Sequence, residues 1–86
     1  MGDKSLFLEI LTPEKTLFRG NVLSIQLPGA KGPFTLLFNH APLISVLTEG
    51  HIRVIDTNHD KHIYDIKDGV VDVKENRVVI LTQPNQ

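Results

Sequence analysis

Apolar and polar residues alternate along most of this chain of 86 residues, in short runs that end at turn-forming residues. Alternation with a period of two is typical of a β-strand that buries one of its faces. The clearest case is residues 22–27, because Leu23, Ile25 and Leu27 fall on one face of the predicted strand. Turn residues recur roughly every 6 to 10 positions, a spacing that indicates an all-β sandwich or barrel. No segment has a convincing helical pattern.

The pattern also predicts individual strands and one register. The predicted strands are residues 6–12, 16–18, 22–27, 34–38 and 43–47, then a hairpin over 50–67, and a second hairpin formed by 70–74 and 77–82. The tip of the first hairpin is predicted at residues 58–60, and mirroring the sequence about His59 gives its register. The predicted cross-strand pairs are Ile52 with Ile66, Val54 with Tyr64 and Arg53 with Asp65.

The predicted core consists of the residues on the inner faces of these strands. They are Leu8, Ile10, Leu23, Ile25, Leu27, Ile52, Val54, Tyr64, Ile66, Val71, Val73, Val78 and Ile80. The opposite face of the second hairpin carries Val70, Val79 and Leu81 beside Asp72. That face is more apolar than contact with solvent alone requires.

Composition narrows the range of functions. A chain of this length fits a single domain over residues 1–86, whose ends at 1–5 and 83–86 are expected to be flexible. Nine basic and ten acidic side chains give a net charge of -1 without long charged blocks. Nucleic acid and anionic lipid are therefore poor candidate partners. The chain has no cysteine and no apolar run of roughly 18 residues, so neither a disulfide nor direct membrane insertion is expected.

Few arrangements of residues could carry catalysis or bind a cofactor. His59 and His62 are close in sequence, but one lies at the predicted hairpin tip and the other in a strand, so they do not supply the convergent ligands that zinc needs. No serine lies in a G-x-S-x-G turn. The segment Gly29-x-x-Gly32 lacks the Gly-Lys-Ser/Thr ending of a phosphate-binding loop. The sequence therefore predicts no catalytic residue, no metal site and no cofactor.

The segment Phe-Asn-His-Ala-Pro-Leu at residues 38–43 places one histidine, His40, in a tight apolar loop. One interpretation is a structural turn in which His40 hydrogen-bonds to the backbone. The other is a docking surface, because loops carry recognition disproportionately. A small enzyme that depends on His40 would need a pocket around this side chain or a bound metal.

The chain resembles the N-terminal domain of ATP synthase epsilon subunits in an ordered set of motifs. These are Gly32, Asn-His-Ala-Pro-Leu at 39–43, Gly50, and Asp-Gly-Val-Val-Asp-Val at 68–73. The family pattern there is Gly-Glu-x-Gly, Gly-His-x-Pro-Leu, and Gly-Gly-hydrophobic-x-x-Val. Residues 8–20 resemble the family's first hairpin.

The resemblance spans residues 6–82 without a gap, with departures at a few positions. Pro33 stands where the family usually has an acid, and Thr35, Asn39 and Asp68 stand where it usually has glycine. Asn39 can keep a glycine-like turn, because asparagine tolerates a positive φ better than most residues. Family members commonly continue into a two-helix hairpin, which in some cases binds ATP. Nothing follows Gln86 here, so the chain is either a natural short form or a truncated one, and no ATP affinity is expected.

The resemblance implies a flattened β-sandwich of about ten short, mostly antiparallel strands in two sheets. It implies a non-catalytic subunit of the central stalk that links the gamma subunit to the membrane rotor ring and helps to couple proton flow to ATP synthesis. The expected location is peripheral, on the cytoplasmic face of a bacterial energy-coupling membrane. The alternative is a free-standing β-sandwich adaptor that binds other proteins.

Two sets of residues are predicted to bind these partners. The candidates for the rotor ring form two loops expected at one end of the sandwich: Gly29, Ala30, Lys31, Gly32, Phe38, Asn39, His40, Ala41 and Pro42. The candidates for gamma are Val70, Val79 and Leu81, because a permanent interface favours an apolar centre.

Overall fold

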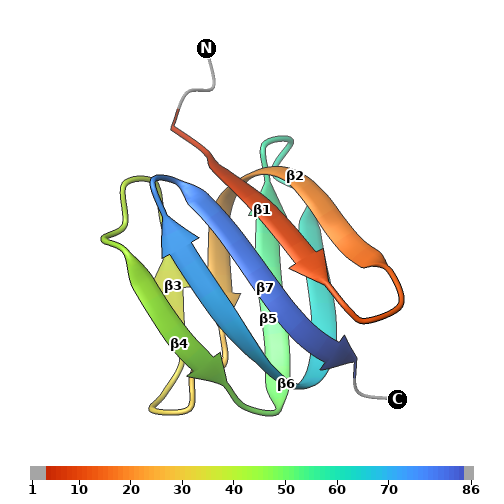
Figure 1. Cartoon of the computed structure of the whole chain (residues 1–86). Coiled ribbons are helices and arrows are strands. Elements are labelled where there is room, and N and C mark those ends of the chain that lie inside the picture. The colour runs from red at the N-terminus through yellow and green to blue at the C-terminus, as the bar shows by residue number, and fades with distance from the viewer. Residues whose placement is uncertain (1–3, 85–86) are drawn as a thin grey trace.

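The protein is described by a computed structural model over residues 4–84, and this part of the chain forms seven strands (Figure 1). The strands are β1 (Leu6–Leu11), β2 (Thr16–Leu27), β3 (Phe34–Leu36), β4 (Leu43–Leu47), β5 (Gly50–Asp56), β6 (Lys61–Lys74) and β7 (Arg77–Pro84). No helix occurs within residues 4–84, so the predicted all-β class is confirmed. Residues 1–3 and 85–86, which belong to the ends expected to be flexible, lie outside the described residues. Gln83 and Pro84, from the same expected end, are the last two residues of β7.

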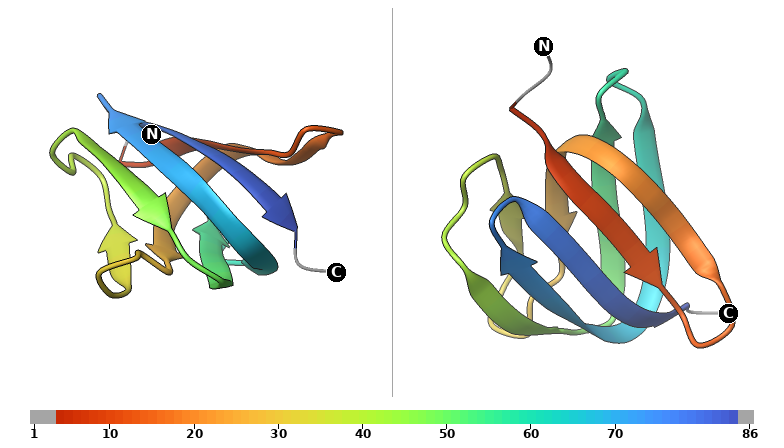
Figure 2. Two further views of the ribbon diagram at one scale, coloured as in Figure 1. Left: turned by 60° about the horizontal axis from the view of Figure 1, so that its bottom comes forward. Right: turned by 45° about the horizontal axis from the view of Figure 1, so that its top comes forward.

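Two long strands each run through both layers of the sandwich (Figures 1 and 2). β2 pairs with β1 along its first half and with β3 and β5 along its second half. β6 pairs with β5 along its first half and with β4 and β7 along its second half. One layer therefore contains β1, β4 and β7, the other contains β3 and β5, and both share β2 and β6.

The strand order is β1-β7-β6-β5-β2-β3, with β4 beside β6, and an antiparallel pairing of β1 with β2 closes the sheet on itself. Among the described strands, β1 and β7 form the one parallel pair. Closure protects most backbone hydrogen-bonding groups of the strands, because it leaves few free edges. The molecule measures 37 × 23 × 19 Å.

The long strands explain why residues 4–84 form seven strands where the resemblance implied about ten shorter ones. Residues 16–18 and 22–27 both belong to β2, and residues 61–67 and 70–74 both belong to β6. Gly69 does not interrupt β6. It sits where β6 passes very close to β7, since a Cβ atom on Gly69 would lie only 2.8 Å from the Leu81 carbonyl oxygen.

The core lies between the two layers and is made of leucine, isoleucine and valine. Its fully buried members are Leu6, Leu8, Ile10, Val22, Ile25, Leu27, Leu36, Leu47, Ile52, Val54, Ile66, Val71, Val73, Val78 and Ile80. Leu6, Val22, Leu36 and Leu47 belong to it although they were not predicted. Tyr64 was predicted to be buried, but it is half-buried and packs against the edge of this core.

Leu23 was predicted to face the core, and this is wrong. The pairing of β2 with β5 shifts register here, because Val22 pairs with Asp56 and Ser24 pairs with Ile55. Leu23 is therefore the extra residue of a β-bulge, which breaks strict alternation. As a result Val22 is fully buried and Leu23 is half-buried.

The predicted register of the β5–β6 hairpin is wrong by two residues. Ile52 pairs with Tyr64 and Val54 pairs with His62, so Asn58 rather than His59 is the centre of symmetry. The carboxylate of Asp56 is the physical reason, since its Oδ1 accepts hydrogen bonds from the backbone N–H groups of Asn58 and Asp60, at 2.8 and 3.0 Å. A shift of two residues keeps every side chain on its predicted face, which is why most of the core prediction holds.

Candidate interaction surfaces

The loop at residues 29–32 is fastened to the end of β4. The Ala30 N–H donates to the Val46 carbonyl at 3.0 Å, and the Thr48 N–H donates to the Pro28 carbonyl at 2.8 Å. Gly29 is buried, and a Cβ atom there would lie 2.6 Å from the Gly32 carbonyl oxygen. Only glycine therefore fits at Gly29. Lys31 is exposed next to this fixed backbone and forms no ion pair with any residue between 4 and 84.

The loop at residues 38–42 is fastened to the turn between β6 and β7. The Asn39 N–H donates to Asn76 Oδ1 at 2.7 Å, and Asn76 Nδ2 donates to Asn39 Oδ1 at 3.1 Å. Asn39 has a φ of 65°, so the glycine-like turn expected at this position is present. The Asn76 carbonyl also accepts from the Phe7 N–H at 2.9 Å, which connects this loop to β1 as well.

His40 has the backbone contacts of a structural turn. Its Nδ1 lies 2.8 Å from the Ala41 carbonyl oxygen, and because a carbonyl can only accept, Nδ1 carries the proton in this contact. The His40 N–H also donates to the Leu37 carbonyl at 3.1 Å. These contacts fit the structural interpretation, and a docking role for the rest of the loop is compatible with them.

The two loops do not lie at one end of the sandwich, so that expectation is wrong. The 29–32 loop is bonded to Val46 and Thr48 at the end of β4, whereas the 38–42 loop leads into the start of β4 (Figure 1). The short strand β3 runs between them, and loops before and after one strand must lie at its opposite ends. No single flat surface on a partner can therefore contact both loops in the same way.

Val70, Val79 and Leu81 belong to a larger apolar surface on the outer face of the layer formed by β4, β6, β7 and β1. We call this surface the apolar face. The strand registers align its residues in two rows, Val46-Val70-Leu81-Leu11 and Ile44-Asp72-Val79-Glu9. Ile44 is 73% exposed, Val46 is 60% exposed and Leu81 is 56% exposed. A groove of about 570 Å³ follows the first row and continues to Pro13.

The prediction missed the part of the apolar face that β4 contributes, although the sequence holds a signal for it. In β4 the alternate set Leu43, Ser45 and Leu47 turns inward, and the remaining residues, Ile44 and Val46, are also apolar. A strand whose two faces are both apolar indicates a second contact beyond the core. The hairpin predicted at residues 70–74 and 77–82 has the same signal, since both of its faces are apolar.

His62 stabilises the β5–β6 turn. His62 Nε2 lies 2.8 Å from Asp56 Oδ2, and the His62 ring packs edge-on against Phe18 with ring centroids 5.2 Å apart. The hydrogen bond from His62, followed by those from the backbone N–H groups, holds the pKa of Asp56 below its ordinary value of 3.8. Among residues 4–84, no three His, Cys, Asp or Glu side chains are grouped as a metal site would require.

Within the described residues, no helix is long and apolar enough to cross a membrane. A closed β-sandwich with two fixed loops and a broad apolar face is typical of a domain that contacts other proteins. Residues 5–84 match the model of the family described as "ATP synthase, Delta/Epsilon chain, beta-sandwich domain", and the chain belongs to this family.

Several relatives named ATP synthase epsilon chain are similar over most of this chain. The Chlorobium limicola protein is 35% identical over 82 residues, which cover 95% of this chain and 93% of that one. The Caulobacter vibrioides protein is 40% identical over 78 residues, covering 91% and 90%. The Campylobacter curvus protein is 45% identical over 76 residues, covering 88% of this chain and 59% of the longer relative.

Two solved structures share the fold. A chain of the Euglena gracilis mitochondrial ATP synthase, in a structure of OSCP, F1 and the c-ring, superposes with a TM-score of 0.87 at 22% identity, covering 95% of this chain and 55% of that one. A chain of the Tetrahymena thermophila central stalk and c-ring superposes with a TM-score of 0.75 at 15% identity, covering 91% and 63%.

Proposed function

We propose that the chain is a non-catalytic subunit of the central stalk of a rotary, proton-driven ATP synthase. In this proposal it links the gamma subunit to the membrane rotor ring and helps to couple proton flow to ATP synthesis. Membership of the delta/epsilon family supports the proposal, as do the stalk and c-ring assemblies named for the similar structures. The observation that carries it is the apolar face, which a protein working alone would not need.

The apolar face is the proposed contact for gamma. Val46, Val70 and Leu81 are exposed neighbours on three adjacent strands. A permanent interface buries such a surface at its centre and keeps charged groups at its rim. Asp72 and Glu9 lie in the second row, where they can form part of this rim.

The 29–32 loop is the proposed contact for the rotor ring. Its backbone is fixed by hydrogen bonds to β4, and it presents the exposed ammonium group of Lys31. A fixed loop transmits force better than a mobile one, because close-packed and hydrogen-bonded structure yields little under strain. The 38–42 loop lies at the other end of β4, so we assign it to the rim of the gamma contact, next to Ile44.

A pair of matched variants tests the gamma contact. Leu81 and Ile63 are both 56% exposed, but Ile63 lies on the outer face of the other layer. Leu81→Asp should weaken binding to purified gamma by about tenfold or more, because it places a charge in an apolar interface. Ile63→Asp should leave this affinity unchanged. Equal effects of the two variants, or no binding of gamma by the unaltered chain, would contradict the assignment.

A second experiment tests the stalk function and separates it from a free-standing adaptor. The chain would be reconstituted with the other synthase subunits in sealed membranes, on the face that corresponds to the bacterial cytoplasm, and proton-driven ATP synthesis would be measured. Lys31→Glu should lower synthesis without changing the folding of the chain. A chain that fails to join the complex at all would instead favour the adaptor.

A further inference from the structure

A second groove lies on the outer face of the layer formed by β3, β5 and parts of β2 and β6, away from the apolar face. Its volume is about 330 Å³, which falls in the range of small-molecule sites. The polar residues that line it are Ser24, Gln26, Thr35, Arg53, Lys61 and His62, and the His62 ring is already bonded to Asp56. Among residues 4–84, no carboxylate lines the groove.

Strand register brings the two cations of the groove together. Arg53 pairs with Ile63, and Lys61 pairs with Ile55, two residues further along β5. Arg53 and Lys61 are therefore diagonal neighbours on one face, at about 7–8 Å between backbones, within reach of long side chains. Both side chains can approach one small anion placed between them.

Neutral hydrogen-bonding groups complete the same face. Gln26 pairs with both Arg53 and Thr35, so the three form one row across β5, β2 and β3. Ser24 lies in the next row, opposite Ile55. The side chains of Ser24, Gln26 and Thr35 form no hydrogen bond with other residues in the range 4–84, so their donors are free for a ligand.

The acidic groups that the structure describes near this groove form no ion pair with Arg53 or Lys61. Asp56 is occupied by His62 and by the backbone of its own turn. Asp65 is diagonal to Arg53 but pairs with His51, and no ion pair joins it to Arg53. Within residues 4–84, neither Arg53 nor Lys61 forms an ion pair. The two cations are thus not neutralised by an ion pair with any described residue, and they lie beside free polar groups.

We propose that this groove binds a small phosphorylated compound. Arg53 and Lys61 would hold the phosphate oxygens, since guanidinium and ammonium groups form strong charge-assisted hydrogen bonds to phosphate. Ser24, Gln26 and Thr35 would donate to the remaining oxygens. Ile55 and Ile63 would cover an apolar part of the ligand, because both lie on the same face and Ile63 is 56% exposed.

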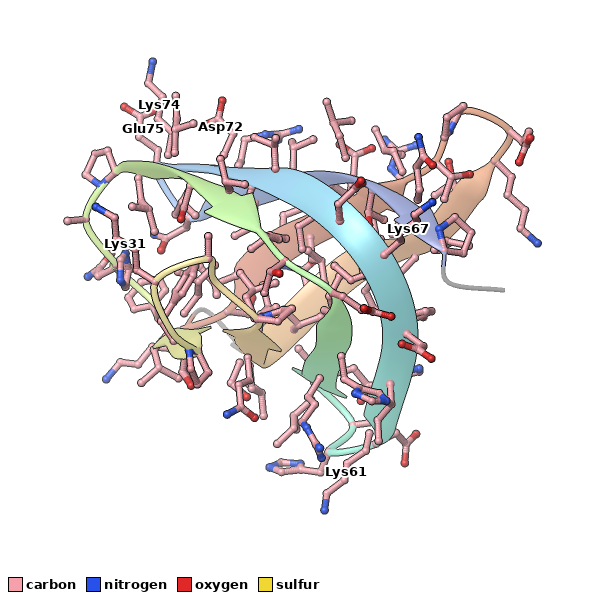
Figure 3. The ribbon with its side chains drawn as sticks, turned by 90° about the horizontal axis from the view of Figure 1, so that it is seen from below. Lys31, Lys61, Lys67, Asp72, Lys74 and Glu75 are labelled. Carbon is pink, nitrogen blue, oxygen red and sulfur yellow. The ribbon has the colours of Figure 1, made fainter. Side chains whose placement is uncertain are left out.

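The test uses the 86-residue chain labelled with ¹⁵N, titrated separately with inorganic phosphate and with phenyl phosphate. Saturable shifts are expected in the amide signals of residues around the groove, and none in the apolar face. Arg53→Gln and Lys61→Gln should each weaken phosphate binding by about tenfold, because each removes a charge-assisted hydrogen bond. Lys74→Gln is the matched control, since Lys74 is an exposed lysine at the opposite end of β6 (Figure 3).

The apolar part of the proposal has its own comparison. Phenyl phosphate should bind several-fold more tightly than inorganic phosphate, and Ile63→Ser should abolish that preference. Sodium chloride at the same ionic strength provides the reference. The proposal is overturned if the shifts do not saturate, if chloride reproduces them, or if Lys74→Gln weakens binding as much as Arg53→Gln. None of these outcomes bears on binding to gamma, which uses the other layer.

Discussion

Replacing Ile25 by alanine should strongly destabilise the protein. Ile25 is fully buried and belongs to the half of β2 that pairs with both β3 and β5. The substitution removes three carbon atoms, a loss of about 2.4 kcal/mol at about 0.8 kcal/mol for each buried methylene. The cavity left behind adds to this, so the expected total is about 2–5 kcal/mol. That is a large share of the roughly 5–15 kcal/mol by which a domain is normally stable.

Thermal unfolding followed by circular dichroism measures this effect. A loss of about 3 kcal/mol should lower Tm by roughly 12–24 °C, since a domain of this size loses about 4–8 °C for each kcal/mol. Ile44→Ala makes the same chemical change at a side chain that is 73% exposed, and should change stability by less than about 0.5 kcal/mol. If Ile25→Ala and Ile44→Ala shift Tm equally, the assignment of the inner face of β2 is refuted.

Changes at three further positions test the turns. Asn39→Ala should lower the free energy of unfolding in urea by about 1–2 kcal/mol, since alanine is strained at a positive φ and the acceptor for Asn76 is lost. Asn39→Gly should be less destabilising, because glycine adopts this φ without strain and only the hydrogen bond is lost. Gly29→Ala should destabilise the chain and move the amide signals of the 29–32 loop, because its Cβ has no space; an unchanged spectrum would contradict the packing. Asp56 has a lowered pKa in the folded state, so it stabilises the fold above its ordinary pKa of 3.8, and this contribution is lost as the pH falls through the lower folded value. Asp56→Asn should therefore lower stability at neutral pH and have a smaller effect in strong acid, and a constant difference across that window would argue against the linkage.

Alternation of apolar and polar residues was sufficient to predict the class of fold and most of the core. It failed where the backbone departs from a regular ladder. The bulge at Leu23 belongs to the pairing of β2 with β5, and residues 22–27 alone carry no sign of it. The shift in the β5–β6 hairpin depends on one side chain, Asp56, which captures two backbone N–H groups. The alternation of apolar and polar residues cannot show whether the hairpin turns through this wider loop or through the tighter one that was predicted.

The surfaces were predictable only in part, for a similar reason. Val70, Val79 and Leu81 were recognised because their own hairpin has two apolar faces. Joining them to Ile44 and Val46 required knowing that β4 pairs with β6, a contact between segments far apart in sequence. The positions of the two loops followed from β3 lying between them, once the lengths of the strands were known.

The passage of β2 and β6 through both layers has a mechanical consequence. In most sandwiches the layers are held together by side-chain packing, and a sideways force can slide one over the other. Here the same two polypeptide segments belong to both layers, so a sliding force loads covalent backbone as well as side-chain contacts. Neither layer can open without unpairing strands in the other. The domain should therefore resist load and unfold as a single unit, with no state in which one layer has come apart alone.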